Sequence, residues 1–162
     1  MERLIADGVS ADAKNGRGDP ALALAAIHGH LDALKLLRKH GANLDATTEY
    51  HGHTALMNAT STGNVDCIKA LLEWGADKDA AAKRGRDTAL HCAARHGQLE
   101  CARLLVVAGA DQAKENSSGE TALQLARRNL YGKETCAEVA ALLEPADATC
   151  AIPSQAVYSA LF

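Results

Sequence analysis

The sequence predicts an all-α solenoid, in which short helix-turn-helix units with β-turn tips stack side by side. Two observations indicate this fold class. Residues 54–77 and 88–111 are identical at ten of 24 positions without a gap, whereas unrelated segments would share roughly two. Hydrophobic residues make up 48% of the chain and aromatic residues only 3%. The apolar content is largely Ala and Leu, which favour helices that pack closely.

The repeat has a nearly constant period along most of the chain. Two series of glycines recur every 34 residues: Gly29, Gly63 and Gly97, then Gly41, Gly75 and Gly109. Four residues that would open the units step by 34, 34 and 33: Pro20, Thr54, Thr88 and Thr121. One such helix pair buries too little apolar surface to be stable alone, so neighbouring units must stack.

Each unit contains local signals for its two helices. We expect Thr88 to cap the first helix of its unit with its hydroxyl, and Asp19 to take that role before Pro20. Gly97 and Gly109 should end the two helices in a left-handed conformation. Small residues at matching places would let adjacent helices approach: Ala25, Ala59, Ala93 and Ala126.

These residues resemble the ankyrin repeat. The resemblance rests on the opening motif at residues 54–56 and 88–94, the latter reading TALHCAA, and on the Gly-Ala-(Asp/Asn) triplets at 41–43, 75–77 and 109–111. It covers roughly residues 4–144. It implies an ankyrin-repeat α-solenoid that binds other proteins, in which His91 hydrogen-bonds the turn.

We expect an ankyrin-repeat domain over residues 1–144 and a C-terminal tail over 145–162. The domain would contain a partial repeat (1–15), repeats at about 16–49, 50–83 and 84–116, and a capping repeat (117–144). Arg127 replaces a small residue of the earlier units, as a terminal unit requires. The capping repeat would have a longer inter-helix turn at 129–133, with its second helix over 138–143.

Both ends of the chain leave alternatives open. The partial repeat is either a half-repeat cap or the continuation of a longer array. In the tail, Ser154 would begin a short apolar helix. That helix packs on the last repeat, docks on a partner, or gives way to disorder.

The composition of the chain limits which classes of partner it can bind and indicates its cellular compartment. The net charge is −3, and general nucleic-acid binders show a strong basic excess, so no nucleic-acid partner is expected. No apolar run approaches 18 residues and the first residues lack a signal-peptide core, so no membrane association is expected. The five cysteines include no CxxC pair, which indicates reduced thiols. We expect a cytoplasmic or nuclear protein, with organelle import left open.

Histidine and cysteine are the candidates for site chemistry. His28 with His30, and His51 with His53, resemble metal-binding pairs, but zinc needs three or four converging ligands. Cys67 and Cys101 repeat at one place, which indicates packing. The chain has no phosphate-binding glycine loop and no hydrolase motif. We therefore expect no enzyme activity, no metal and no cofactor.

The family resemblance also predicts where a partner binds. Ankyrin partners usually lie along the concave face, which is made by the turn tips and the exposed ends of the first helices. Transfer by matching position gives the predicted partner-binding residues: Arg17, Asp19, Ile27, His28, Tyr50, His51, His53, Ser61, Thr62, Arg84, Arg86, Asp87, Arg95, His96, Ser118 and Glu120. We expect these side chains to be free, because none is needed to stack the repeats.

The predicted function is a protein–protein interaction module or adaptor, either monomeric or a subunit of a hetero-complex. Arg84, Arg86 and Arg95 predict an acidic partner segment, with an apolar anchor over Tyr50. Alternatively, these charges only keep the surface soluble. A different class of function is a structural subunit of a larger assembly, packed through several faces including the tail. Nucleic-acid binding by the arginines would instead show a steep loss of affinity with salt.

Overall fold

The computed structural model describes residues 10–128 and 134–144, and this part of the chain contains eight helices and no strand. The helices are α2 (Ala21–Ile27), α3 (Leu31–Lys39), α4 (Ala55–Thr62), α5 (Val65–Glu73), α6 (Ala89–His96), α7 (Leu99–Val107), α8 (Ala122–Arg128) and α9 (Glu134–Leu143). Predictions for residues 1–9 of the partial repeat, for the turn at 129–133 and for the tail lie outside the described residues. None of the helices in the described part is long and apolar enough to cross a bilayer.

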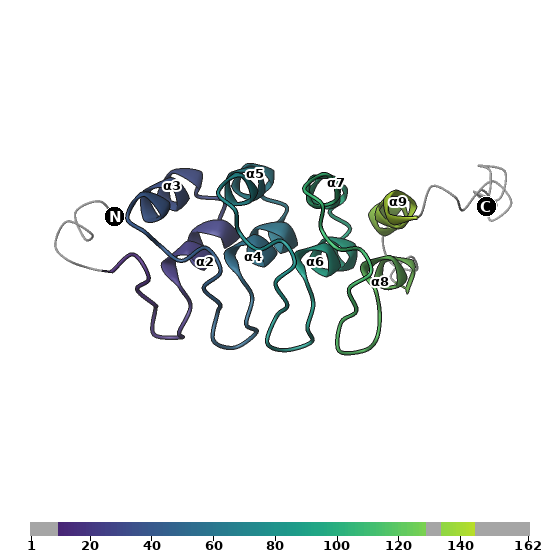
Figure 1. The fold of residues 1–162 in the computed structure, drawn as a ribbon, viewed down its shortest axis with the longest axis horizontal. Helices are drawn as coiled ribbons and strands as arrows, with labels where there is room; N and C mark the ends of the chain where they lie inside the picture. The colour runs from purple at the N-terminus through teal and green to yellow at the C-terminus, as the bar shows by residue number, and fades with distance from the viewer. Residues whose placement is uncertain (1–9, 129–133, 145–162) are drawn as a thin grey trace, which may run out of the picture.

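The helices form two parallel rows (Figure 1). In the inner row, α2, α4, α6 and α8 each contact the next member of the row, and in the outer row α3, α5, α7 and α9 do the same. Each inner helix also packs on the outer helix that follows it in sequence. The predicted all-α solenoid is therefore confirmed.

Small residues let the rows pack closely. The four matching alanines of the inner row are at most 4% exposed, as predicted: Ala25, Ala59, Ala93 and Ala126. Larger apolar side chains fill the space between the two rows, among them Leu37, Leu71 and Leu105, which are also buried. Because each helix has at most ten residues, its stability comes from this packing rather than from its own length.

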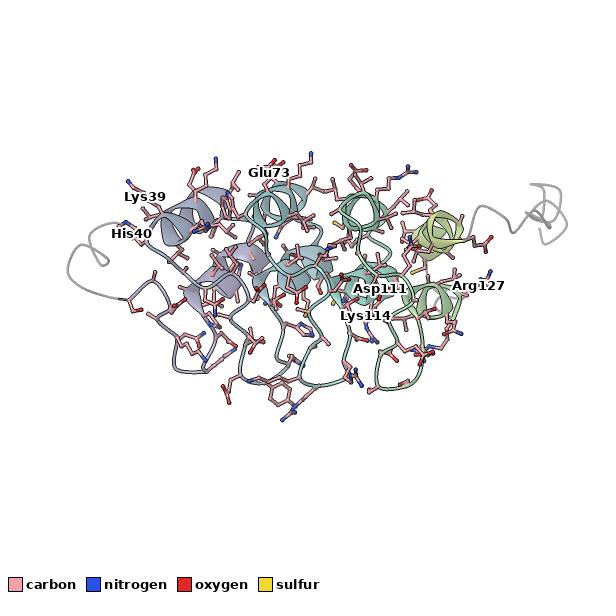
Figure 2. All side chains as sticks on the ribbon, in the orientation of Figure 1. Lys39, His40, Glu73, Asp111, Lys114 and Arg127 are labelled. Atoms are coloured by element: carbon pink, nitrogen blue, oxygen red, sulfur yellow. The ribbon has the colours of Figure 1, made fainter. Side chains whose placement is uncertain are left out.

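The inner row ends on a charged side chain. Ala26, Thr60 and Ala94 are fully buried at one matching place. In α8 that place holds Arg127, whose side chain is 54% exposed, projects outward and pairs with Glu144 at 2.8 Å (Figure 2). A buried place has thus become an exposed one, as expected where no described helix covers it.

Helix ends follow the predictions in part. Gly63 and Gly97 end α4 and α6 in the left-handed conformation, with φ of 77° and 66°. The prediction that Asp19 caps the first helix is wrong. Pro20 is the residue before α2 and no side chain caps that helix, because Asp19 is held inside the turn, where its N–H donates to Asn15 Oδ1 at 2.9 Å. Helix α9 begins at Glu134, four residues earlier than expected.

Aspartates join successive helix pairs at the turns that follow the outer helices. Asp12 Oδ1 accepts the N–H of Asn43 at 2.8 Å, and Asp45 Oδ1 accepts that of Asp77 at 2.9 Å. Asp79 continues the series to Asp111 at 2.8 Å. Each bond crosses from one unit to the next, so these carboxylates hold the units in register.

Candidate functional site

Four loops project from the inner row of helices (Figure 1). We call them the tips and number them in chain order: residues 15–19, 48–53, 82–87 and 116–120. Backbone hydrogen bonds join neighbouring tips: the Arg84 N–H donates to the His51 carbonyl at 3.2 Å, and the Ser117 N–H to the Gly85 carbonyl at 2.8 Å. These bonds hold the later tips in register, so their side chains form one surface.

The third tip differs from the others in its backbone. Gly18, Gly52 and Gly119 occupy one matching place with φ between 70° and 79°, and Arg86 occupies it in the third tip with φ of 53°. A side chain in this left-handed region costs roughly 1–2 kcal/mol. At Gly52 an added Cβ would lie 2.4 Å from Lys83 Cβ.

A groove of about 470 Å³ lies between the first two tips. Its lining residues come from both tips and from the helices α2 and α4: Arg17, Asp19, Ile27, Thr48, Tyr50, His51, His53 and Asn58. All but Thr48 and Asn58 are among the residues predicted to bind a partner. The structure therefore brings predicted residues from two repeats to one concave feature.

Aromatic rings and an arginine form the edge of this groove. Tyr50 is 64% exposed, and its ring meets that of His51 edge to face at 4.6 Å between centroids. The His51 and His53 rings lie 5.3 Å apart. Arg84, from the third tip, lies 4.3 Å above the centre of the Tyr50 ring. The contact between Arg84 and Tyr50 thus bridges the second and third tips.

His53 is the more enclosed of the two histidines. Burial lowers the pKa of His53 below its usual 6.5, and the neighbouring His51 lowers it further. A side-chain hydrogen bond with Asn58 and the charge of Asp87 oppose this shift, whereas Arg95 adds to it. His53 is therefore neutral at pH 7, and the charge it could offer to an anion appears only in acid.

Asn58 is a buried polar residue that sequence reasoning missed. It is 7% exposed, and its Nδ2 has no hydrogen-bond partner among the residues described. An unsatisfied buried donor costs roughly 1–3 kcal/mol. The signal was present in the repeat: the other units hold Leu24, Cys92 and Leu125 at this place, so Asn58 stands where an apolar side chain is the rule.

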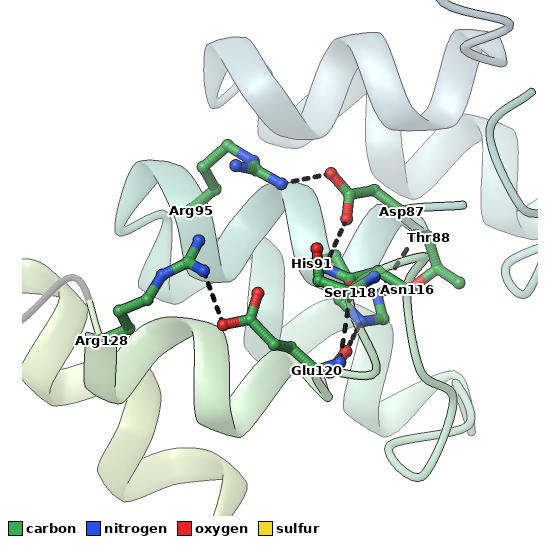
Figure 3. A network of polar contacts seen from close by, with 8 residues as sticks. All are labelled: Asp87, Thr88, His91, Arg95, Asn116, Ser118, Glu120 and Arg128. Atoms are coloured by element: carbon green, nitrogen blue, oxygen red, sulfur yellow. Dashed lines mark hydrogen bonds and ion pairs between the residues drawn. The ribbon is translucent and has the colours of Figure 1, made fainter. Parts of the chain in front are cut away.

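The third and fourth tips carry a network of ion pairs and hydrogen bonds (Figure 3). Arg95 pairs with Asp87 at 2.5 Å, and Asn116 Nδ2 donates to the other oxygen of Asp87 at 3.1 Å. Arg128 pairs with Glu120 at 2.6 Å. The expectation that Asp87, Arg95 and Glu120 are free is therefore wrong, because a carboxylate of each tip pairs with an arginine of the inner helix that follows it. Arg95 is not available as an unpaired cation.

His91 joins the third unit to the fourth, as the resemblance implied. The Thr88 N–H donates to its Nδ1 at 3.2 Å, and the Thr88 hydroxyl lies 2.9 Å from the same nitrogen. Because a backbone N–H can only donate, the proton of neutral His91 sits on Nε2, which donates to the Glu120 carbonyl at 2.9 Å. This ring is 1% exposed and structural.

The remaining predicted residues lie along the helix ends and the last tip. Ser61 and Thr62 hydroxyls donate to backbone carbonyls one turn earlier, at 2.9 and 3.0 Å. His96 is exposed, and the backbone N–H of Ser118 donates to Asn116 Oδ1 at 2.9 Å. His28 and His30 have ring centroids 5.9 Å apart. Within residues 10–128 and 134–144, no group of three or more His, Cys, Asp or Glu side chains is arranged to hold a metal ion.

The described cysteines are buried inside the solenoid. Cys67, Cys92, Cys101 and Cys136 are all free thiols. Burial raises the pKa of Cys92 and of Cys101 to about 11, and also raises that of Cys67. These three thiols stay protonated at neutral pH, so they act as packing residues rather than as nucleophiles.

A comparison with known protein families agrees with this architecture. The family model described as ankyrin repeats (3 copies) matches residues 1–82 and again residues 79–150. The two matches together cover the helix pairs and all four tips.

Proposed function

Because the chain belongs to the ankyrin-repeat family, whose members generally serve as protein–protein interaction modules and typically are not enzymes, we propose that it binds an acidic segment of a partner protein. The binding surface is the concave face, made by the tips and by the exposed ends of α2, α4 and α6. The partner segment runs across the first three tips. An adaptor of this kind needs no chemistry beyond recognition.

The observation that carries this proposal is a set of cations without a counter-charge. Arg17, Arg84 and Arg86 form no ion pair with any described residue, whereas Arg95 and Arg128 each have a carboxylate partner. Paired arginines gain little from a further anion, but unpaired ones can bind carboxylates in a bidentate geometry. We therefore propose that Arg17, Arg84 and Arg86, on the first and third tips, bind the acidic segment, and that Arg95 does not.

Apolar contact would come from the edge of the groove. Tyr50 is largely exposed, and the stacked Arg84 holds its ring against the next tip. Tyrosine is enriched among residues that dominate interface energetics, because it is large and loses little conformational freedom. A partner side chain packed beside Tyr50 would supply the anchor, and the arginines would set the orientation.

Affinity capture with mass spectrometry, followed by binding measurements on the partner recovered, tests this proposal. The parent chain is compared with Arg17→Glu/Arg84→Glu and with a matched control, Arg38→Glu/Lys69→Glu, which reverses two exposed charges on the outer row. All three should have equal far-UV circular dichroism. We expect the tip variant to lose affinity by at least about tenfold and the control to keep it.

Other outcomes count against the proposal. Equal retention by all three chains would mean that the tip cations do not contact the partner. Equal loss from both variants would favour the structural-subunit function, in which several faces are packed in an assembly.

A further inference from the structure

The floor of the groove holds a side chain that weakens the fold. Asn58 occupies the place of Leu24, Cys92 and Leu125 in the other units, and it is 7% exposed. Leucine at this place would add apolar contact and leave no buried polar atom unsatisfied. Departures of this kind from a repeat pattern tend to occur at functional sites.

The side chain of Asn58 has a hydrogen-bond donor that lacks an acceptor. Its amide shares a hydrogen bond with His53, but its Nδ2 donor has no acceptor among the residues of 10–128 and 134–144. A donor without a partner needs an oxygen acceptor. Because Asn58 lines the groove, an oxygen carried by a partner that reaches the floor can supply it.

The walls of the groove select among oxygen ligands. Arg17 lines it as a cation and His51 as a hydrogen-bond donor, and Asp19 is the one carboxylate among its lining residues. Asp19 belongs to the first tip, where its Oδ2 accepts a hydrogen bond from Asn15 Nδ2 at 3.4 Å. A carboxylate has two oxygens, so it can accept from Asn58 with one and from the wall with the other, which a backbone carbonyl cannot.

We propose that this groove is a subsite for one carboxylate side chain, Glu or Asp, of the acidic partner, with Asn58 Nδ2 as the buried donor that reads it. Arg17 supplies the charge, and His51 supplies a further donor. This proposal rests on the proposed function and makes it more specific, because it assigns one residue of the partner to one pocket. The unpaired Arg84 and Arg86 then bind the rest of the segment.

The test uses a defined probe on the full chain. N-acetyl-tetraglutamate amide and N-acetyl-tetraglutamine amide are titrated into 15N-labelled protein, and the side-chain NH2 signals of Asn58 and the backbone signals of the tips are followed by NMR. We expect the glutamate peptide to shift the Asn58 NH2 signals and to bind at least about tenfold more tightly than the glutamine peptide.

Asn58→Leu is the sharpest variant, because it restores the residue type of the other units. It should fold at least as stably as the parent and bind the glutamate peptide at least about tenfold more weakly. Arg17→Gln, at an exposed tip, should also weaken binding without affecting the core. Arg128→Gln, at the end of α8 and outside the lining of the groove, is the matched control and should leave affinity unchanged.

The outcomes separate this subsite from the proposed function. If the glutamate peptide shifts only signals of the third tip and binds Asn58→Leu as tightly as the parent, the subsite is wrong while acidic recognition stands. If both peptides bind with equal affinity, the groove does not distinguish a carboxylate from a neutral amide. If the glutamate peptide shifts no signal on the concave face, both the subsite and the acidic-segment proposal fail.

Discussion

The guanidinium of Arg84 lies 4.3 Å above the centre of the Tyr50 ring, although the two residues belong to different tips. A cation over an exposed aromatic ring contributes about 0.5–1 kcal/mol. This contact also keeps a largely exposed ring at the edge of the groove, where a partner would meet it. The pair therefore links the stability of the tips to the shape of the proposed binding surface.

Removing the Tyr50 ring should lower the stability of the fold. We expect Tyr50→Ala to lower the free energy of unfolding by about 0.5–1 kcal/mol, as measured by urea denaturation, and to weaken partner binding. Tyr50→Phe keeps the ring face and should change stability by less. A double-mutant cycle with Arg84→Ala should recover the coupling, and strict additivity of the two substitutions would contradict a direct contact.

Arg86 should lower the stability of the fold and strengthen the binding of an acidic partner. Because its φ of 53° lies where the other tips use glycine, Arg86→Gly should raise the free energy of unfolding by about 1 kcal/mol. The same change should weaken binding of an acidic partner. Arg86→Ala also removes the charge but keeps the unfavourable conformation, so it should weaken binding without stabilising. A Gly variant that is less stable than the Ala variant would show that the strain is not relieved.

His91 should be one of the most sensitive positions in the chain. Its ring is 1% exposed and bridges Thr88 to the Glu120 carbonyl, so His91→Ala should cost about 2–3 kcal/mol by leaving buried groups without partners. His91→Gln should cost less. Gln124 holds the matching place in the next unit, and its Oε1 accepts the Thr121 N–H at 2.8 Å. Equal losses in both variants would mean that ring packing, not hydrogen bonding, matters here.

The stability of the fold should fall in acid partly through His53. Burial and the neighbouring His51 lower the pKa of His53 in the folded state below 6.5, so the unfolded chain binds a proton first as the pH falls. The stability that neutral His53 contributes is present above pH 6.5 and is lost between that pH and its folded pKa. Urea denaturation at pH 7.5 and 5.5 should therefore show a smaller loss in His53→Gln than in the parent.

The other histidines provide the control for this pH effect. His40 stands exposed at the end of α3 (Figure 2), outside the groove, so His40→Gln is the matched substitution for this measurement. If His53→Gln and the parent lose the same stability in acid, His53 is not a source of it.

The fold was predictable because each unit repeats the same local signals. Thr54, Gly63 and Gly97 act where the pattern placed them, and His91 makes the contact expected from the family. The predicted cap at Asp19 was wrong, since a turn drew that side chain into its own hydrogen bonds. The predicted freedom of Arg95 was wrong because its partner, Asp87, comes from the tip before its own helix. Such pairings depend on how the tips fold back, which spacing in the chain does not reveal.

By itself the sequence determined the stacking of helix pairs, since a period of 33 or 34 residues buries the same alanines and leucines in every unit. It also placed most of the groove residues on the tips. Only the tertiary structure decided which charges are neutralised, that Arg86 adopts a left-handed conformation, and that Asn58 Nδ2 has no hydrogen-bond partner among the described residues. The physical reason is that stacking depends on a local apolar pattern. The pairing of polar groups depends instead on how each tip folds back, which brings together residues 8 positions apart, as in Asp87 and Arg95, or 29 apart, as in Asp87 and Asn116.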